Sequence, residues 1–140
     1  MTDFAEQVAQ WSRETQAKLR LAVRKVALEA FREVILMSPV KSGRFRGNWQ
    51  VAVGQVPQGV VVLDDKTGQA VISKVEAAVM QLEVGETIYL VNNLPYARRL
   101  EYGWSQQAPE GMVRVTEARW RPIVEKVSQQ LRAGMPTDAG

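Results

Sequence analysis

The sequence of 140 residues contains no cysteine and no histidine. Without cysteine the chain can form no disulfide and offers no thiol nucleophile. Without histidine it lacks a common zinc and copper ligand and the usual base of a catalytic triad. The adjacent acids Asp64 and Asp65 lie in a turn-forming DDKTG segment, and solvation of that turn explains them better than catalysis does. We therefore expect a protein that is not an enzyme and that uses no metal ion or cofactor.

The sequence also lacks a long hydrophobic run. No stretch of about 18 consecutive apolar residues occurs, so no transmembrane helix is expected. The N-terminal sequence MTDFAEQVAQWSRE has early acids and no apolar core, unlike a signal peptide. Hydrophobic residues make up 46% of the chain, which is ordinary for a folded domain. These features predict a soluble protein made in a reducing cytoplasm, with a single domain at 1–132 and a flexible tail at 133–140.

Residues 3 to about 37 have the apolar spacing of one long helix. Asp3 followed by Glu6 has the arrangement of a capping box, and no glycine or proline interrupts the pattern before Pro39. At 1.5 Å per residue this helix would be roughly 50 Å long, which is more than a domain of this size can cover. We therefore expect part of it to pack against another subunit. The positions that recur every three or four residues are Phe4, Val8, Trp11, Thr15, Leu19, Ala22, Val26, Ala30, Val34 and Met37.

Positive charge is concentrated in the first third of the chain. The net charge of the whole chain is +3, whereas residues 1–46 hold nine basic and five acidic side chains and so carry +4. Arg13, Arg20 and Arg24 fall near one line of the predicted helix, opposite its apolar stripe. This basic face could meet the phosphates of DNA, or it could be an ordinary solvated helix surface.

The remainder of the chain alternates short strands and helices. Residues 49–53 and 60–63 read as two strands of a hairpin joined at VPQG, and 86–91 read as a further strand. A helix is expected near 69–82 with Thr67 as its cap, and a short helical turn in PYARRLEYG ends at Gly103. A last helix runs from Pro109 to about Arg132, where Pro122 either kinks it or begins a new helix.

Together these elements predict an α+β fold. It consists of a long N-terminal helix, a small and mainly antiparallel sheet with an inserted helix, and a C-terminal helix packed on it.

The segment SPVKSGRFRGNW, residues 38–49, is a candidate contact loop. Arginines on both sides of Phe45 match surfaces in which cations neutralise phosphates and an aromatic ring stacks on a base. The alternative is that Phe45 anchors the loop in the core while the arginines pair with nearby acids. We name as contact residues, to DNA or to a neighbouring subunit, Lys41, Arg44, Phe45 and Arg46.

A second unusual segment spans residues 89–112 and is rich in aromatic, amide and basic side chains. Exposed tyrosine, tryptophan and arginine are typical of protein interfaces. The alternative is a surface loop whose aromatic rings fold back on the core. The residues expected at a subunit or partner interface are Tyr96, Arg98, Arg99, Tyr102 and Trp104.

The order of these segments resembles the tail-completion, or minor tail component, family of long-tailed bacteriophages and prophages. In that family the loop after the first helix commonly reads Thr-Pro-Val-Asp-Thr-Gly-Arg-Leu-Arg, and later segments carry Asn, Pro-Tyr-Ala and Leu-Glu-x-Gly. Lys41 stands here where Asp is common and Phe45 where Leu is, which puts a cap or ion pair of that Asp in doubt. The matching residues are Ser38, Pro39, Val40, Ser42, Gly43, Arg44 and Arg46; Asn92 or Asn93, Pro95, Tyr96, Ala97, Leu100, Glu101 and Gly103; then Gln107, Ala108, Pro109, Gly111 and Met112.

The resemblance covers roughly residues 1–130 and implies a structural role in the virion neck. Proteins of this kind form a ring at the head-proximal end of the tail, around the DNA channel, and have no enzymatic activity. The implied partners are further copies of the chain, with a hexamer favoured by tail symmetry, the tail terminator or tail tube protein, and the head-completion or connector proteins. Non-specific contact with packaged DNA is compatible with the basic first third, and no membrane is involved.

A different class of function stays open beside this one. The basic first third and the RFR loop would also suit a small free-standing nucleic-acid-binding protein, although the sequence has no helix-turn-helix or RNA-recognition signature. Binding to duplex DNA that weakens steeply with salt, by a monomer or dimer, would favour that alternative over a ring.

Overall fold

The computed structural model describes residues 3–133, and helix α1 (Phe4–Met37) is its longest element. The Asp3 carboxylate accepts a hydrogen bond of 2.8 Å from the backbone N–H of Glu6, as a helix cap should. At the other end Ser38 is extended, with ψ of 137°, because the proline that follows disfavours helical backbone there. The long helix predicted from the sequence is confirmed.

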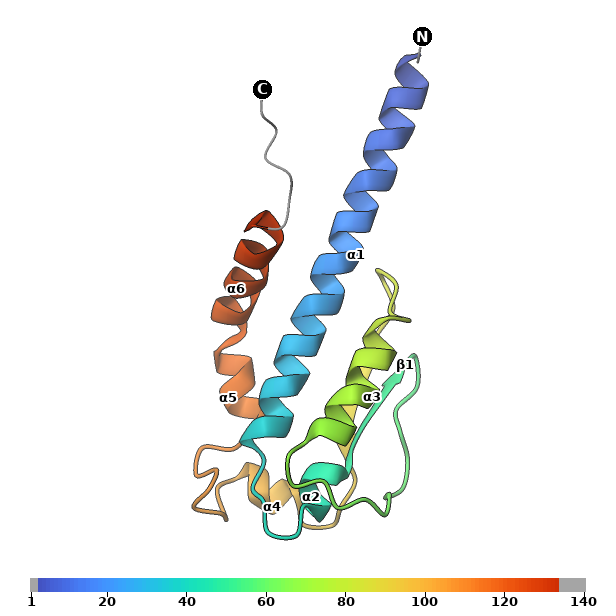
Figure 1. Cartoon of the computed structure of the whole chain (residues 1–140). Helices are drawn as coiled ribbons and strands as arrows, with labels where there is room; N and C mark the ends of the chain where they lie inside the picture. Colours follow the sequence, from blue (N-terminus) through green and yellow to red (C-terminus); the bar gives the residue numbers. More distant parts are fainter. Residues whose placement is uncertain (1–2, 134–140) are drawn as a thin grey trace.

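The other elements pack on the C-terminal half of α1, on two sides (Figure 1). On one side lie α3 (Gln69–Val79) and an antiparallel ribbon of β1 (Trp49–Val53) and β2 (Ile88–Asn92). On the other side lie α5 (Val113–Ala118) and α6 (Trp120–Ala133). Short helices α2 (Arg44–Gly47) and α4 (Ala97–Glu101) occupy the loops at the lower end of the molecule in Figure 1. The predicted α+β fold, with its inserted helix and packed C-terminal helix, is confirmed.

The predicted hairpin between 49–53 and 60–63 is wrong. Strand β1 pairs instead with β2, Trp49 opposite Asn92 and Val53 opposite Ile88, while residues 60–63 form no strand. Hydrogen bonds from side chains, and not backbone pairing with a second strand, fix the segment that contains residues 60–63. The Asn48 side-chain oxygen accepts from the N–H of Val61 at 2.9 Å. Two further amides bind the same stretch, since Gln50 and Asn93 both donate to the Gly59 carbonyl. The short continuous apolar run at 60–63 was therefore not sufficient to define a strand, whereas the alternating residues 49–53 do form one.

The boundaries of two predicted helices also change. Helix α3 ends at Val79 rather than near 82, and its N-cap is Gly68, not Thr67. The final helix begins at Val113 rather than Pro109, and Arg119 separates it into α5 and α6. Pro122 lies in the first turn of α6, so it begins a new helix there, where its missing N–H costs no helical hydrogen bond. Ala133 still belongs to α6, and residues 134–140 of the predicted tail lie outside the described residues.

The hydrophobic core sits between α3, the ribbon and the C-terminal half of α1. Its most completely buried side chains include Ile35, Val75 and Met112, each of which contributes about 1.5–3 kcal/mol by leaving water. The N-terminal half of α1 projects beyond this body, with Phe4 80% and Trp11 66% exposed (Figure 1). No helix among the described residues is long and apolar enough to cross a membrane.

Candidate interaction surface

Two parts of the chain that lie far apart in the sequence, residues 38–48 and 92–112, meet at the lower end of the molecule. The Gln107 side chain makes two hydrogen bonds with the backbone of Val40, accepting from its N–H at 2.8 Å and donating to its carbonyl at 3.1 Å. The Asn92 amide donates to the Phe45 carbonyl at 2.9 Å. The ring of Phe45 lies 6.1 Å from that of Tyr96. Segments 38–48, 92–103 and 105–112, which carry the motif residues, thus form one packed unit.

Arg46 fastens this unit to the end of α1. Its guanidinium donates to the carbonyls of Leu36 at 3.0 Å and Ser38 at 2.8 Å, and to that of Lys66 at 2.8 Å. Burial lowers the pKa of Arg46, while the negative charge of Asp65 acts in the opposite direction. An arginine with these three carbonyl partners is committed to holding the fold together. The sequence left two roles open for the loop arginines, contact with a nucleic acid or anchoring of the loop. Arg46 anchors the loop, but its partners are backbone carbonyls and not the acids that were expected.

Phe45 is likewise a core residue. It lies in α2, buried, with its ring edge-on to Trp49 at 5.8 Å between centroids. It cannot stack on a nucleic-acid base without leaving the core. Lys41 and Arg44 are exposed, by contrast, and line an open groove of about 650 Å³ together with Tyr96. The predicted contact loop therefore divides into two anchoring residues, Phe45 and Arg46, and two accessible cations.

Glu101, at the end of α4, caps helix α5. Its carboxylate accepts hydrogen bonds from the backbone N–H groups of Met112, Val113 and Arg114, at distances from 2.6 to 3.2 Å. A carboxylate at this position satisfies orphan N–H groups and faces the positive end of the helix dipole. The Leu-Glu-x-Gly segment therefore positions the C-terminal helices.

Beyond this cap the chain exposes a cluster of stacked arginine and aromatic side chains. The guanidinium of Arg114 lies 4.7 Å and that of Arg98 5.9 Å from the centre of the Tyr102 ring, and Arg99 lies 5.0 Å from that of Trp104. Tyr102 is 57% and Trp104 72% exposed. We call this cluster the arginine–aromatic patch; it consists of Arg98, Arg99, Tyr102, Trp104 and Arg114.

The structure thus brings only some of the predicted interface residues together on one surface. Four of its five residues belong to the patch, whereas Tyr96 is half-buried and packs on the hydrophobic core. Arg114, which the sequence did not suggest, joins the patch because Glu101 brings the start of α5 beside α4 and its carbonyl accepts from the Arg114 side chain.

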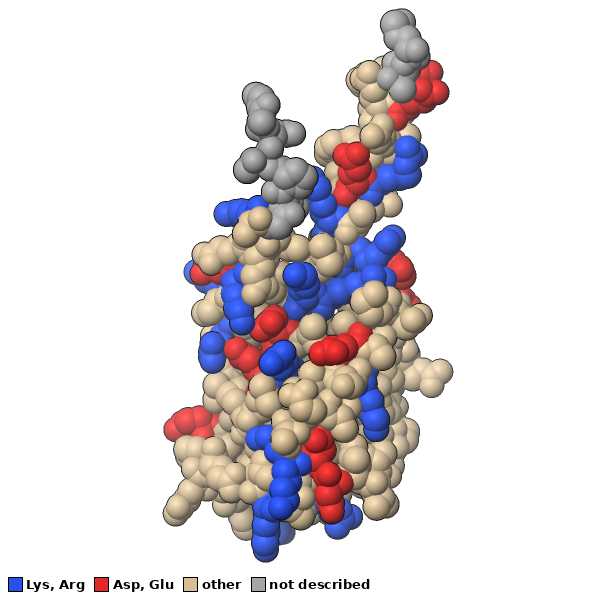
Figure 2. All heavy atoms as spheres, in the orientation of Figure 1, with Lys and Arg blue, Asp and Glu red and all other residues tan. Residues whose placement is uncertain are grey.

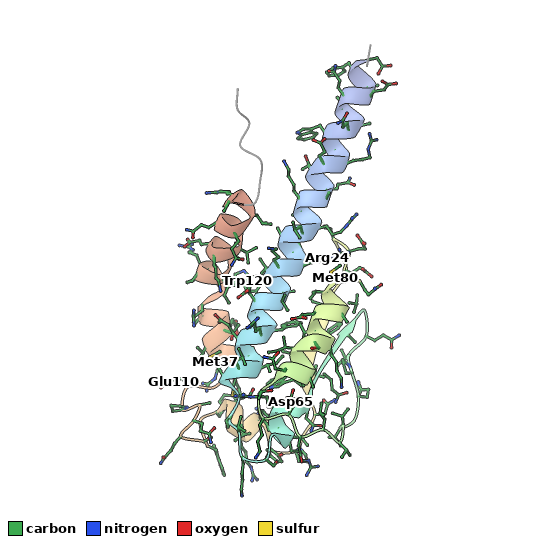
Figure 3. The ribbon with its side chains drawn as sticks, in the orientation of Figure 1. Arg24, Met37, Asp65, Met80, Glu110 and Trp120 are labelled. Atoms are coloured by element: carbon green, nitrogen blue, oxygen red, sulfur yellow. The ribbon has the colours of Figure 1, made fainter. Side chains whose placement is uncertain are left out.

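The basic face predicted on α1 is largely neutralised. Arg20 pairs with Glu83 at 2.8 Å, and Arg24 donates to the Leu82 carbonyl at 2.9 Å and also reaches Glu83. Figure 3 shows Arg24 directed toward the loop after α3. Of the three, Arg13 is exposed, on the projecting half of the helix, and Arg20 and Arg24 are half-buried. Within one subunit these three side chains therefore do not form a continuous cationic stripe that could face a DNA channel.

The acids that could carry chemistry are dispersed or used as caps. Within residues 3–133 there is no group of three or more acids that could hold a metal ion. Asp65 is buried, not solvated as the turn predicted, because its carboxylate accepts from the N–H groups of Gly68 and Val71 at the start of α3 (Figure 3). In the sequence, the one sign that Asp65 accepts hydrogen bonds at the start of α3 is its position shortly before the predicted helix.

Comparisons with known proteins give no relative for this chain. No protein-family model, no curated protein and no solved structure matches it.

Proposed function

We propose that the chain is a non-enzymatic structural protein of the neck of a long-tailed phage. In this role it completes the tail and joins it to the head as one subunit of a ring around the DNA channel, and it assembles in the host cytoplasm. The observation that carries the proposal is the packed unit of three motif segments. These segments resemble the tail-completion family in sequence, and here they act as anchors that present an exposed arginine–aromatic patch.

The exposed surfaces suit a protein that binds other proteins. Tyrosine, tryptophan and arginine are the side chains that most often dominate binding energy at interfaces. The patch presents two exposed aromatic rings of this kind, and it begins in α4, which lies at the end of the molecule opposite the projecting end of α1 (Figure 1). The projecting end of α1 exposes a second, apolar surface, so the subunit offers neighbours a surface at each end. Its expected neighbours are other copies, the tail terminator or tube protein, and the head-completion proteins.

The nucleic-acid alternative has less support. Phe45 and Arg46 are occupied in the fold, and Arg20 and Arg24 interact with the segment after α3. Of the residues predicted to contact DNA, Arg13, Lys41 and Arg44 remain as exposed cations, which is few for a dedicated DNA-binding surface.

The solution mass separates these two functions. Light scattering at low and moderate salt should give a discrete ring, or a monomer that forms rings only when tail tubes are added. A monomer or dimer that ignores tails and binds duplex DNA in a salt-dependent manner would establish the nucleic-acid function instead.

Substitution of the patch aromatics is expected to disrupt assembly without unfolding the chain. For Tyr102→Ala and Trp104→Ala we expect a stability loss below about 1 kcal/mol, because exposed cation–π contacts are weak. Joining of heads to tails should fall about 30-fold or more if these rings are interface hot spots. Val62→Ala, at another fully exposed side chain, is the control and should leave both properties unchanged. If the patch variants join heads and tails normally, the patch is not an interface.

A further inference from the structure

The projecting half of α1 carries an apolar stripe that nothing in the described chain covers. Phe4, Val8 and Trp11 recur at helical spacing and are 80%, 45% and 66% exposed. A stripe of large apolar side chains on a surface helix normally faces a partner, because its exposure to water is unfavourable. A partner for such a stripe would offer an apolar surface of similar length.

The same chain has an open apolar groove farther along the molecule. It has a volume of about 430 Å³ and lies between α1, the segment entering β2, and α6. Trp120, which is 52% exposed, forms one wall, and Figure 3 shows it between α6 and α1. The lining residues are Ala22, Val23, Val26, Ala27, Ala30, Phe31, Leu82, Glu86, Ile88, Trp120 and Val124.

The two surfaces match in length. Phe4 to Trp11 spans roughly 10 Å along a helix, and the α1 side of the groove, Ala22 to Phe31, spans roughly 13 Å at 1.5 Å per residue. Small side chains at Ala22, Ala27 and Ala30 allow another helix to approach closely.

The two helices differ in charge. Residues 3–14 hold three acids and one base, a net charge of −2, whereas α6, which forms one wall of the groove, holds three bases and one acid, a net charge of +2. Lys126 of α6 is paired with Glu29 of the same molecule, and Glu86 lines the groove itself, so attraction by charge is confined to the rim around Arg121 and Arg132. Figure 2 shows acidic side chains at the projecting end of α1, and both basic and acidic side chains over the middle of the molecule.

The stripe cannot reach the groove of its own molecule. Both lie on one continuous helix, and residues 4 and 26 are separated by roughly 33 Å along its axis. We infer that the stripe formed by Phe4, Val8 and Trp11 binds the groove of a second copy of this chain. The contact is head-to-tail, because each copy uses a different surface on each side, and repetition of such a contact builds a ring when the rotation closes. The choice of a second copy as the partner rests on the proposed ring.

The test uses two single substitutions that each remove one half of the contact. Trp11→Glu places a charge on the stripe, and Val26→Glu places one in the groove at a half-buried position. Leu21→Glu is the matched control, because Leu21 is 47% exposed on the same helix but belongs to neither surface. Circular dichroism should show that all three variants remain folded.

Sedimentation velocity of the full chain should show self-association for the wild type and for Leu21→Glu. Trp11→Glu and Val26→Glu should each associate about 30-fold more weakly. Mixed in equal amounts they should form a one-to-one pair, since one supplies an intact groove and the other an intact stripe. A Val26→Glu protein that still forms dimers alone, or a mixture that forms no pair, would overturn the head-to-tail contact. A wild type that stays monomeric at its highest soluble concentration would overturn it as well.

A tail-binding assay separates this inference from the proposed function. If wild type and both variants bind tails equally, the neck role stands and the contact is wrong. If the mixed variants pair as expected but wild type ignores tails, the contact stands and the neck role fails.

Discussion

Glu101→Ala is expected to lower the free energy of unfolding by about 2–3 kcal/mol and the Tm by roughly 6–9 °C. The substitution removes a charged acceptor from three backbone N–H groups at the start of α5. One of these belongs to Met112, a fully buried residue, so water cannot readily replace the carboxylate there. Glu101→Gln keeps one acceptor oxygen and should lose about half as much. Thermal denaturation followed by circular dichroism measures both effects.

The control for this prediction is Glu110→Ala. Glu110 is an exposed acid nine residues farther along, and no side-chain hydrogen bond or ion pair in the described part of the chain involves it. Its substitution should change stability by less than about 0.5 kcal/mol. Equal losses for the two variants would mean that Glu101 contributes general surface charge and does not cap α5.

Gly43→Ala is expected to destabilise the protein by about 4 kcal/mol, the largest effect of a single methyl group that we predict. Gly43 has φ of +92°, and a Cβ there would lie 2.6 Å from the backbone nitrogen of Lys66 and 2.8 Å from that of Asp65. Its carbonyl also accepts from the N–H groups of Gly47 and Asp65. The loop must therefore separate from the segment that precedes α3. Urea denaturation gives the change in free energy.

Gly59→Ala separates the cost of the backbone conformation from the cost of the close approach. Gly59 also has a positive φ, +73°, but a Cβ added there meets no atom within 4 Å. Only left-handed strain of about 1 kcal/mol is expected. If Gly43→Ala cost no more than Gly59→Ala, the packing of the motif loop on residues 65–66 would be incorrect.

Helices were more predictable from this sequence than strand pairing. The period of α1, its Asp3 cap and its end before Pro39 are local features, and local features determine a helix. The partner of β1 depends instead on tertiary contacts, since β2 begins 35 residues after β1 ends and α3 lies between them. Amide side chains such as Asn48 hold the segment at 60–63, and no periodicity shows where a side chain will bind.

The candidate interaction surface was predictable only in part, for a similar reason. Tyr102 and Trp104 could be named as candidate interface residues because tyrosine, tryptophan and arginine in a loop are typical of interfaces, and both rings are exposed. The roles of Arg46 and Glu101 depend on carbonyl and N–H groups of distant elements, which composition does not show. The apolar groove was missed because its walls come from three segments of the chain.

The most direct test of the neck role uses tails assembled in the absence of this chain. Purified protein is added to such tails, and their ends are imaged by electron microscopy before free heads are supplied. The proposed function predicts a ring at the head-proximal end of each tail and the recovery of joined particles. Tails that show no added density and never join heads, together with protein that binds duplex DNA on its own, would contradict it.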